Sequence, residues 1–222
     1  MNIVRRKNEN LLIKEFISFF KKIQIKKRKK NTRLTFVLTG GTSPINLYKE
    51  LSKIKIDWSN VDFFFSDERY VSNKSKNSNY NLAYNLLFKK IKIKKKNIFL
   101  IDTNFENINE SAKNYEKVVK KYFYQKKIKF DLCLLGMGID GHIASIFPKS
   151  AELQQKFIVK PVYRNDFNRI TLGLNIINNS KRIILWLNNK NKTSVFKKLK
   201  KKGKKVPFNN LKKNKVSYYS II

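Results

Sequence analysis

Short apolar segments recur along the chain, and helical or polar segments separate them. The segments 34–38 (LTFVL), 61–66 (VDFFFS) and 131–135 (DLCLL) are short and almost wholly apolar. A strand with apolar side chains in both directions must be covered on both faces, as in a parallel sheet. Between such segments lie amphipathic stretches with helical periodicity, such as residues 9–25. This alternation predicts an α/β layered fold with a mostly parallel central sheet flanked by helices.

Weaker patterns extend this alternation along the rest of the chain. We expect a helix that starts near Pro44, with Ser43 as its capping hydroxyl, because proline suits the first turn of a helix. The polar residues 67–81 predict a loop. Periodicity predicts further helices at 82–88, 107–125 and 193–200 and further strands at 97–101, 158–163, 169–174, 182–187 and 216–222. Because no long linker interrupts the 222 residues, we expect one domain, 1–222.

The formal net charge of +35 ordinarily indicates nucleic acid or another polyanion as a partner. Here 42 of the basic residues are lysines and 8 are arginines, whereas base and bidentate phosphate recognition favours arginine. Lysine, asparagine and isoleucine are over-used together, and the lysines are spread along the chain. We therefore interpret the charge as compositional bias. A nucleic-acid partner is not expected, and a basic polyanion-binding module is kept as an alternative function.

Three absences narrow the class of protein. No segment approaches the ~20 apolar residues of a membrane span, and no cleavage site follows residues 11–20, so a cytoplasmic protein without a membrane partner is expected. Cys133, the only cysteine, lies in an apolar run and is expected to be a buried thiol. One histidine and one cysteine argue against a metal site built on these residue types.

Glycine and polar residues gather at the ends of three predicted strands. These loops are 39–44 (TGGTSP), 66–71 (SDERYV) and 136–142 (GMGIDGH), and two of them hold five of the seven glycines. In a parallel sheet the carboxyl ends of the strands share one edge, where ligands bind. Glycine lets the backbone approach a ligand closely, and free N–H groups bind anions. The loops predict a site for a phosphorylated or carboxylated small molecule.

The loop 136–142 matches the G-x-G-x-x-G pattern of dinucleotide sites, but its context does not. A helix that follows it must stop at Pro148, and no acidic residue ends a strand about 20 residues on. The first glycine loop, after the first clear strand, lacks the pattern altogether. A dinucleotide cofactor is therefore not expected.

His142 is the only histidine, and it directly follows the third glycine of this loop. One interpretation is a structural histidine at a helix start. Its place at the ligand-binding edge favours a catalytic base, because a neutral imidazole accepts a proton from water near neutral pH. Arg69 follows a buried strand and is expected to hold a phosphate, with a surface ion pair to Asp67 as the alternative. Asp67 is expected to orient His142 or Arg69.

Taken together, these residues resemble the 6-phosphogluconolactonase family. The similar segments are LTGGTSPINLYKEL, IDWSNVDFFFSDERYV, SNYNLAYNLLF and LLGMGIDGHIASIFP, in the family's order, and GMGIDGHIASIFP is the most specific. The resemblance covers about residues 34 to 200. It implies a Rossmann-like fold shared with sugar-phosphate isomerases and deaminases, and no metal or organic cofactor. It also implies a small phosphorylated sugar lactone as the partner, and we expect a monomer or a weak homo-oligomer.

The resemblance further implies a role for each site residue. His142 is the base that activates water to open 6-phospho-D-glucono-1,5-lactone to 6-phosphogluconate, in the oxidative pentose phosphate pathway. Arg69, Lys192 and Arg169 hold the phosphate. The remaining residues implied to line the substrate pocket are Gly40, Gly41, Thr42, Ser43, Gly138, Asp140 and Gly141.

Some features depart from the family's pattern. Asn189 stands where members often have glycine, just before the position of Lys192, and the chain looks trimmed at both ends.

A hexosamine-6-phosphate isomerase or deaminase of the same fold is an alternative function. Such deaminases typically continue after the aspartate–glycine–histidine element with phenylalanine, asparagine and glutamate. Here residues 143–148 are IASIFP, and no acid precedes Glu152, which favours lactone hydrolysis.

Overall fold

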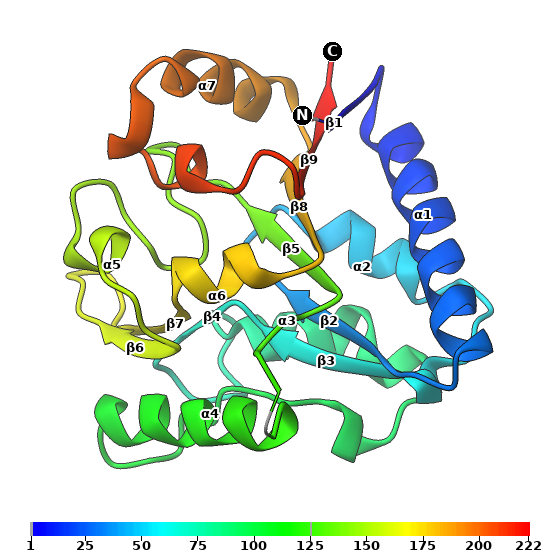
Figure 1. The fold of residues 1–222 in the computed structure, drawn as a ribbon, viewed down its shortest axis with the longest axis horizontal. Helices are drawn as coiled ribbons and strands as arrows, with labels where there is room; N and C mark the ends of the chain where they lie inside the picture. Colours follow the sequence, from blue (N-terminus) through cyan, green and yellow to red (C-terminus); the bar gives the residue numbers. More distant parts are fainter. Residues whose placement is uncertain (1, 125) are drawn as a thin grey trace.

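The computed structural model describes residues 2–124 and 126–222. Within these residues, a six-stranded sheet has the order β1-β9-β8-β5-β2-β3, and every neighbouring pair is parallel (Figure 1). The strands are β1 (Asn2–Arg6), β2 (Leu34–Leu38), β3 (Val61–Phe65), β5 (Leu132–Gly136), β8 (Arg182–Leu187) and β9 (Val216–Ile221). The predicted layered fold with a mostly parallel central sheet is thus confirmed.

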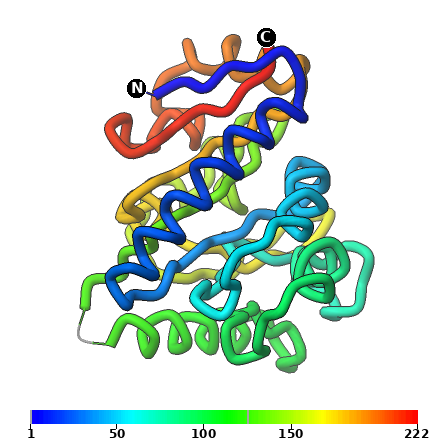
Figure 2. Tube along the Cα trace, turned by 90° about the vertical axis from the view of Figure 1, so that its right-hand side faces the viewer, coloured from blue at the N-terminus to red at the C-terminus, as the bar shows by residue number. Residues whose placement is uncertain are grey.

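Helices cover both faces of this sheet. They are α1 (Glu9–Lys29), α2 (Ile45–Leu51), α3 (Asn79–Leu86), α4 (Ile108–Tyr122), α5 (Ala151–Gln154), α6 (Leu174–Asn179) and α7 (Lys190–Lys200). Figure 2 shows α1 running diagonally across the molecule in front of the strands. No helix in the described part of the chain is long and apolar enough to cross a membrane.

Successive side chains of β3 pack against opposite faces of the sheet. Phe63 lies 5.8 Å, between ring centroids, from Phe36 of β2, and Phe36 in turn lies 5.3 Å from Phe20 of α1. Phe64 points to the other face, where its ring lies 5.0 Å from Tyr122 of α4. Successive side chains of a strand point in opposite directions, so a run of phenylalanines fills both layers of the core.

A second sheet pairs three short strands in antiparallel order, β4-β7-β6. They are β4 (Asp67–Arg69), β7 (Arg169–Leu172) and β6 (Val159–Val162). Residues 67–69 were predicted to be loop, and this prediction is wrong. Their polar side chains hide the strand, because β4 is stabilised by backbone pairing with β7 and not by a local apolar pattern. The pairing places Arg69 directly opposite Arg169.

Most predicted elements are present, and several differ in bounds. The strands 34–38 and 182–187 have the predicted limits. The predicted strand 97–101 is reduced to a single parallel bridge between Ile98 and Phe63, in which Phe99 N donates to the Phe63 carbonyl at 2.8 Å. The predicted helix 107–125 ends at Tyr122, and Gln125 lies outside the described residues. Strand β1 and the short helices α5 and α6 were not predicted.

Two smaller predictions concern single residues. Cys133 of β5 is buried and unpaired, as expected, and burial raises the pKa of its thiol. Ser43 was expected to cap the helix that follows it, and this is wrong. Helix α2 begins at Ile45 without a side-chain cap, and the hydroxyl of Ser43 contacts Lys192 instead.

A buried ionic cluster joins the start of β5 to α1 and β8. The carboxylate of Asp131 accepts hydrogen bonds from Lys181 Nζ at 2.8 Å and from Thr35 N at 3.0 Å, and it lies 2.8 Å from Lys27 Nζ. Burial by itself raises the pKa of Asp131, but the bonds from Lys181 and Lys27 bring it below its ordinary value. The folded state therefore holds this proton less tightly than the unfolded state does.

We expect Asp131→Asn to lower the free energy of unfolding by about 2 kcal/mol at pH 7, because two lysines lose their buried counter-charge. A carboxylate with a lowered folded-state pKa contributes stability above its unfolded pKa of about 3.9 and loses it as the pH falls through the folded value. The difference from wild type should therefore shrink below about pH 4, as measured by urea unfolding. Glu106→Gln, at an exposed carboxylate, is the control. If Asp131→Asn lowered the free energy of unfolding equally at pH 7 and below about pH 4, this account would be contradicted.

Candidate active site

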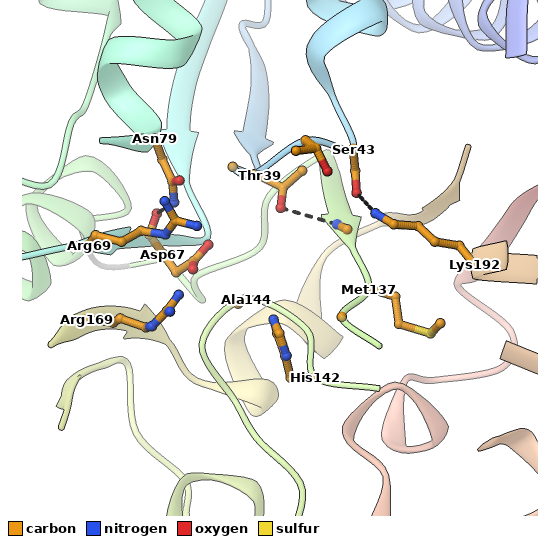
Figure 3. A pocket seen from close by; sticks show the side chains of 15 residues that line it. Thr39, Ser43, Asp67, Arg69, Asn79, Met137, His142, Ala144, Arg169 and Lys192 are labelled. Carbon is orange, nitrogen blue, oxygen red and sulfur yellow. Dashed lines mark hydrogen bonds between the residues drawn. The ribbon is translucent and has the colours of Figure 1, made fainter. Parts of the chain in front are cut away.

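A pocket of about 170 Å³ opens at the carboxyl ends of β2, β3 and β5. It lies where the order of the sheet reverses, because the chain passes from β2 outward to β3 and returns on the other side of β2 as β5. Of the predicted residues, it is lined by Gly40, Gly41, Thr42, Ser43, Asp67, Arg69, Gly138, His142, Arg169 and Lys192. Figure 3 shows both arginines on one side, Ser43 and Lys192 on the other, and His142 between them.

The first glycine loop brings its backbone close to the start of α3. A Cβ on Gly40 would lie 1.7 Å from the side-chain oxygen of Asn79, so only glycine fits there. Gly41 has a φ of +72°, in the left-handed region that glycine adopts without strain. Tyr48 of α2 fixes the start of the loop, since its hydroxyl donates to the Thr39 carbonyl at 2.6 Å. The loop therefore presents backbone to the pocket in a defined shape.

The two arginines lie side by side because β4 pairs with β7 in the register Arg69–Arg169. Arg69 donates from Nη1 to the Asn77 carbonyl at 2.6 Å, and Arg169 donates from Nη2 to Asp166. The Nε atoms of both are buried and have no hydrogen-bond partner among the described residues. Two adjacent guanidinium groups with unused donors form an electropositive wall that suits an oxyanion.

Asp67 lines the pocket but does not contact His142 or Arg69 as expected. Its carboxylate accepts a hydrogen bond from the hydroxyl of Ser145 at 2.8 Å and from that of Ser66 at 2.9 Å. The expectation that Asp67 orients either residue directly is corrected accordingly. Asp67 instead fastens the loop that follows His142 to strand β4.

Asp140 is the carboxylate that orients His142. His142 Nδ1 lies 2.6 Å from Asp140 Oδ1, and the same oxygen accepts the backbone N–H of His142 at 3.1 Å. Burial would raise the pKa of Asp140, but the hydrogen bond and charge of His142 lower it below its ordinary value. A carboxylate at Nδ1 selects the tautomer that carries its proton there, which leaves Nε2 as an acceptor. The imidazole is 30% exposed and lines the pocket.

The loop around His142 is irregular, and residues 143–150, which directly follow it, do not form a helix. Gly138 N donates to the His142 carbonyl at 3.0 Å, and Gly141 N donates to the Gly138 carbonyl at 3.0 Å. Asp140 and Gly141 were predicted to line the pocket, and they do not. Asp140 lies against His142, and Gly141, with a φ of +87°, packs so tightly that a Cβ would lie 2.3 Å from Val206.

Lys192 reaches the pocket from the first turn of α7. Asn189, which departs from the family's glycine, caps this helix by accepting the backbone N–H of Lys192 at 2.8 Å. The Nζ atom of Lys192 donates to the hydroxyl of Ser43. Burial lowers the pKa of Lys192, and the negative charge of Glu9 opposes this shift. The substitution at 189 therefore leaves the lysine at the pocket.

The sequence did not identify Glu68, which holds the backbone of Arg69 and of the start of α3 beside the pocket. Its buried carboxylate accepts the backbone N–H groups of Arg69 and Asn79 at 2.7 Å each and of Tyr80 at 2.8 Å. Burial raises the pKa of Glu68 to about 7, although these hydrogen bonds oppose the shift. The missed lining residues are Thr39, Asn79, Gly136, Met137 and Ala144. Thr39, Gly136 and Met137 lie within the predicted loops, Ala144 lies two residues beyond the loop 136–142, and the segment SNYN was the available signal for Asn79.

The sequence model of the family "Glucosamine-6-phosphate isomerases/6-phosphogluconolactonase" matches residues 7–219. The chain belongs to this family. A curated member from Thermotoga maritima, named 6-phosphogluconolactonase, is 33% identical over 162 residues, which are 72% of this chain and 71% of that protein. A second, from Nostoc, has the same name and is 34% identical over 74% of this chain and 70% of its own length.

A solved structure from this family has the same fold as this chain. The crystal structure of 6-phosphogluconolactonase from Thermotoga maritima superimposes with a TM-score of 0.86 and 26% identity. The superposition covers 99% of this chain and 98% of that one. The fold of this chain is therefore that of a family member over nearly its whole length.

Proposed function

We propose that the protein is a lactone hydrolase that converts 6-phospho-D-glucono-1,5-lactone to 6-phosphogluconate, with His142 as the general base. The observation that carries this proposal is the Asp140–His142 pair at 2.6 Å, with the imidazole facing a pocket that two arginines also line. Membership of the family, and the name of its curated relatives, support the substrate.

The reaction requires one water and one proton carrier. His142 Nε2 takes a proton from water while the water oxygen attacks the lactone carbonyl carbon. Asp140 stabilises the imidazolium that forms, because its carboxylate stays ionised beside Nδ1. When the tetrahedral intermediate collapses, the bond from the carbonyl carbon to the ring oxygen breaks. His142 returns its proton to that ring oxygen, which gives the open-chain acid and restores the neutral base.

The negative charge that develops on the carbonyl oxygen needs donors inside the pocket. The backbone of the first glycine loop, at Gly40 and Gly41, lies at the pocket wall. Free N–H groups in such a loop stabilise an oxyanion, and each donor contributes about 3 kcal/mol to the transition state. We assign this role to the glycine loop and the phosphate to the cationic side chains.

Arg69 and Arg169 are the proposed phosphate ligands, together with Lys192 on the opposite wall. Their buried, unpartnered Nε atoms support this assignment, since an unsatisfied buried donor costs free energy that a phosphate oxygen recovers. Thr42 and Ser43 add hydroxyl groups at the same pocket. Asp67 has a supporting role here, because it fixes the loop that carries the base.

The alternative of a hexosamine-6-phosphate deaminase requires a catalytic carboxylate beyond the histidine. The residues after His142 are Ile143, Ala144 and Ser145, and the hydroxyl of Ser145 is bonded to Asp67. Among the described residues that line the pocket, Asp67 is the only acid, and its carboxylate is held by two serine hydroxyls. Lactone hydrolysis is therefore the function that the geometry supports best.

The direct test is an assay with freshly generated 6-phosphogluconolactone, in which the rate is corrected for spontaneous hydrolysis. We expect the protein to accelerate hydrolysis well above this background and to release no ammonia from glucosamine 6-phosphate. A lactone rate equal to background would contradict the proposal. Ammonia release from the amino sugar would instead support the deaminase.

Arg69→Ala is expected to raise KM for the lactone by about 10- to 100-fold with a smaller change in kcat, because it removes a charged hydrogen-bond donor to the phosphate. Arg164→Ala is the matched control. Arg164 is exposed and stacks 4.2 Å from the ring of Phe147 near the pocket, but it does not line it. Unchanged KM in Arg69→Ala, measured by steady-state kinetics, would exclude the phosphate assignment.

A further inference from the structure

A second pocket, of about 720 Å³, lies at the opposite end of the sheet from the active site. Its walls come from the C-terminal half of α1 and from the residues that precede or begin β5, β8 and β9. Because these strands are parallel, their amino ends lie at the far edge of the sheet from the catalytic loops. The pocket therefore has no part in the proposed hydrolysis.

The lining of this pocket is strongly cationic. Seven lysine and arginine side chains line it within the described residues, and Asp131 is its single carboxylate. That carboxylate is already paired with Lys27 and Lys181. The side chains of Lys30 and Lys129 are exposed and have no partner within residues 2–124 and 126–222. The positive charge of the pocket is thus far from neutralised.

Lys129 and Lys215, which both line the pocket, are close enough to repel each other, and Lys127 and Lys212 beside the pocket add to the repulsion. Burial lowers the pKa of Lys215, and the charges of Lys212, Lys129 and Lys127 lower it further. Crowding of like charges costs free energy in the empty protein. An anion in the pocket removes this cost, so the charge pattern is complementary to a ligand with several negative charges.

The volume of this pocket and the residue types that line it indicate the class of ligand. The volume falls in the range of small-molecule sites, and Phe19 and Ile23 of α1 form a half-buried apolar part of the wall. Lysine supplies compact point charges on flexible stems, which can follow a chain of phosphate groups. We propose that this pocket binds an oligophosphate chain, either as a free inorganic oligophosphate or as the phosphate chain of a nucleotide.

The test is isothermal titration calorimetry of the full chain with inorganic triphosphate and, separately, with ATP. Excess 6-phosphogluconate is present throughout, so that the active site is occupied. We expect saturable binding at one site, and Lys30→Gln/Lys129→Gln should weaken it roughly tenfold because two charged contacts are lost. Lys113→Gln/Lys117→Gln removes the same charge from exposed positions on α4 and should change the affinity less than about twofold.

The comparison of triphosphate with ATP distinguishes a free inorganic oligophosphate from the phosphate chain of a nucleotide. Equal affinities would assign the site to the phosphate chain alone, and tighter binding of ATP would add a contact between its base and the wall at Phe19. Both outcomes support the proposal. An equal loss in both double variants would show only a diffuse field and would overturn it, as would the absence of saturable binding. Binding of a single-stranded RNA oligonucleotide that depends on Lys30 and Lys129, without binding of triphosphate, would also overturn it in favour of a nucleic-acid surface.

Discussion

His142→Ala is expected to lower kcat for lactone hydrolysis by about 100- to 10,000-fold, because it removes the proposed acceptor of the proton from the attacking water. KM should change little, since the proposed phosphate contacts come from Arg69, Arg169 and Lys192. Stability should be nearly unchanged, because the imidazole is 30% exposed and its hydrogen bonds are made within its own loop. The measurement is steady-state kinetics on freshly generated lactone, with the spontaneous rate subtracted.

Two further variants test whether the loss of kcat is specific to His142. Asp140→Asn keeps a hydrogen-bond acceptor beside Nδ1 but removes the charge that stabilises the imidazolium, so its kcat should fall less than that of His142→Ala. Ser150→Ala changes a residue near the same loop that does not line the pocket and should leave kcat unchanged. Full activity in His142→Ala would show that another group activates the water.

Gly138→Ala should have the second largest effect, a loss of about 100-fold in kcat, because a displacement of about 1 Å in a catalytic group costs this much. A Cβ on Gly138 would lie 2.2 Å from both Nδ1 and Cε1 of His142 and 2.8 Å from Asp140 Oδ1. The ring must therefore shift, and this shift disturbs its hydrogen bond with Asp140. The backbone of Gly138 does not have a positive φ, so the clash and not backbone strain is responsible.

Gly203→Ala is the control for this variant. Gly203 has a φ of +65° and open space around its Cβ position, and it does not line the pocket. Its replacement should cost roughly 1 kcal/mol of stability and no activity. Thermal unfolding and kcat measured on both variants distinguish the two effects. If Gly138→Ala keeps full kcat, the ring position inferred here does not govern catalysis.

Much of the central sheet could be predicted because its signals are local. The strands 34–38 and 182–187 are apolar runs whose burial on two faces dictates extended structure whatever their neighbours are. The edge that carries the site followed from a general property of parallel sheets. His142 was found because it is the only histidine and lies beside three glycines at that edge.

The supporting residues were harder to assign. Asp67 and Asp140 are both acids at the ends of strands, and the sequence offers no means to decide which of them contacts His142. The decision depends on the loop conformation, in which Gly138 and Gly141 close a turn that folds Asp140 back onto the imidazole. Glu68 could not be assigned from the sequence, because its buried carboxylate is held by backbone N–H groups of Arg69 and of the start of α3.

By itself, the sequence determined the alternation of strands and helices, the edge of the sheet where the pocket lies, and the histidine that lines it. These depend on periodicity and residue type within a few positions of each other. Only the tertiary structure decided that Arg69 lies beside Arg169 and that Lys192 contacts Ser43 on the opposite wall of the pocket. These pairs are brought together by strand pairing and helix packing between distant segments. Such contacts depend on the register of the whole fold and leave no trace in the local pattern.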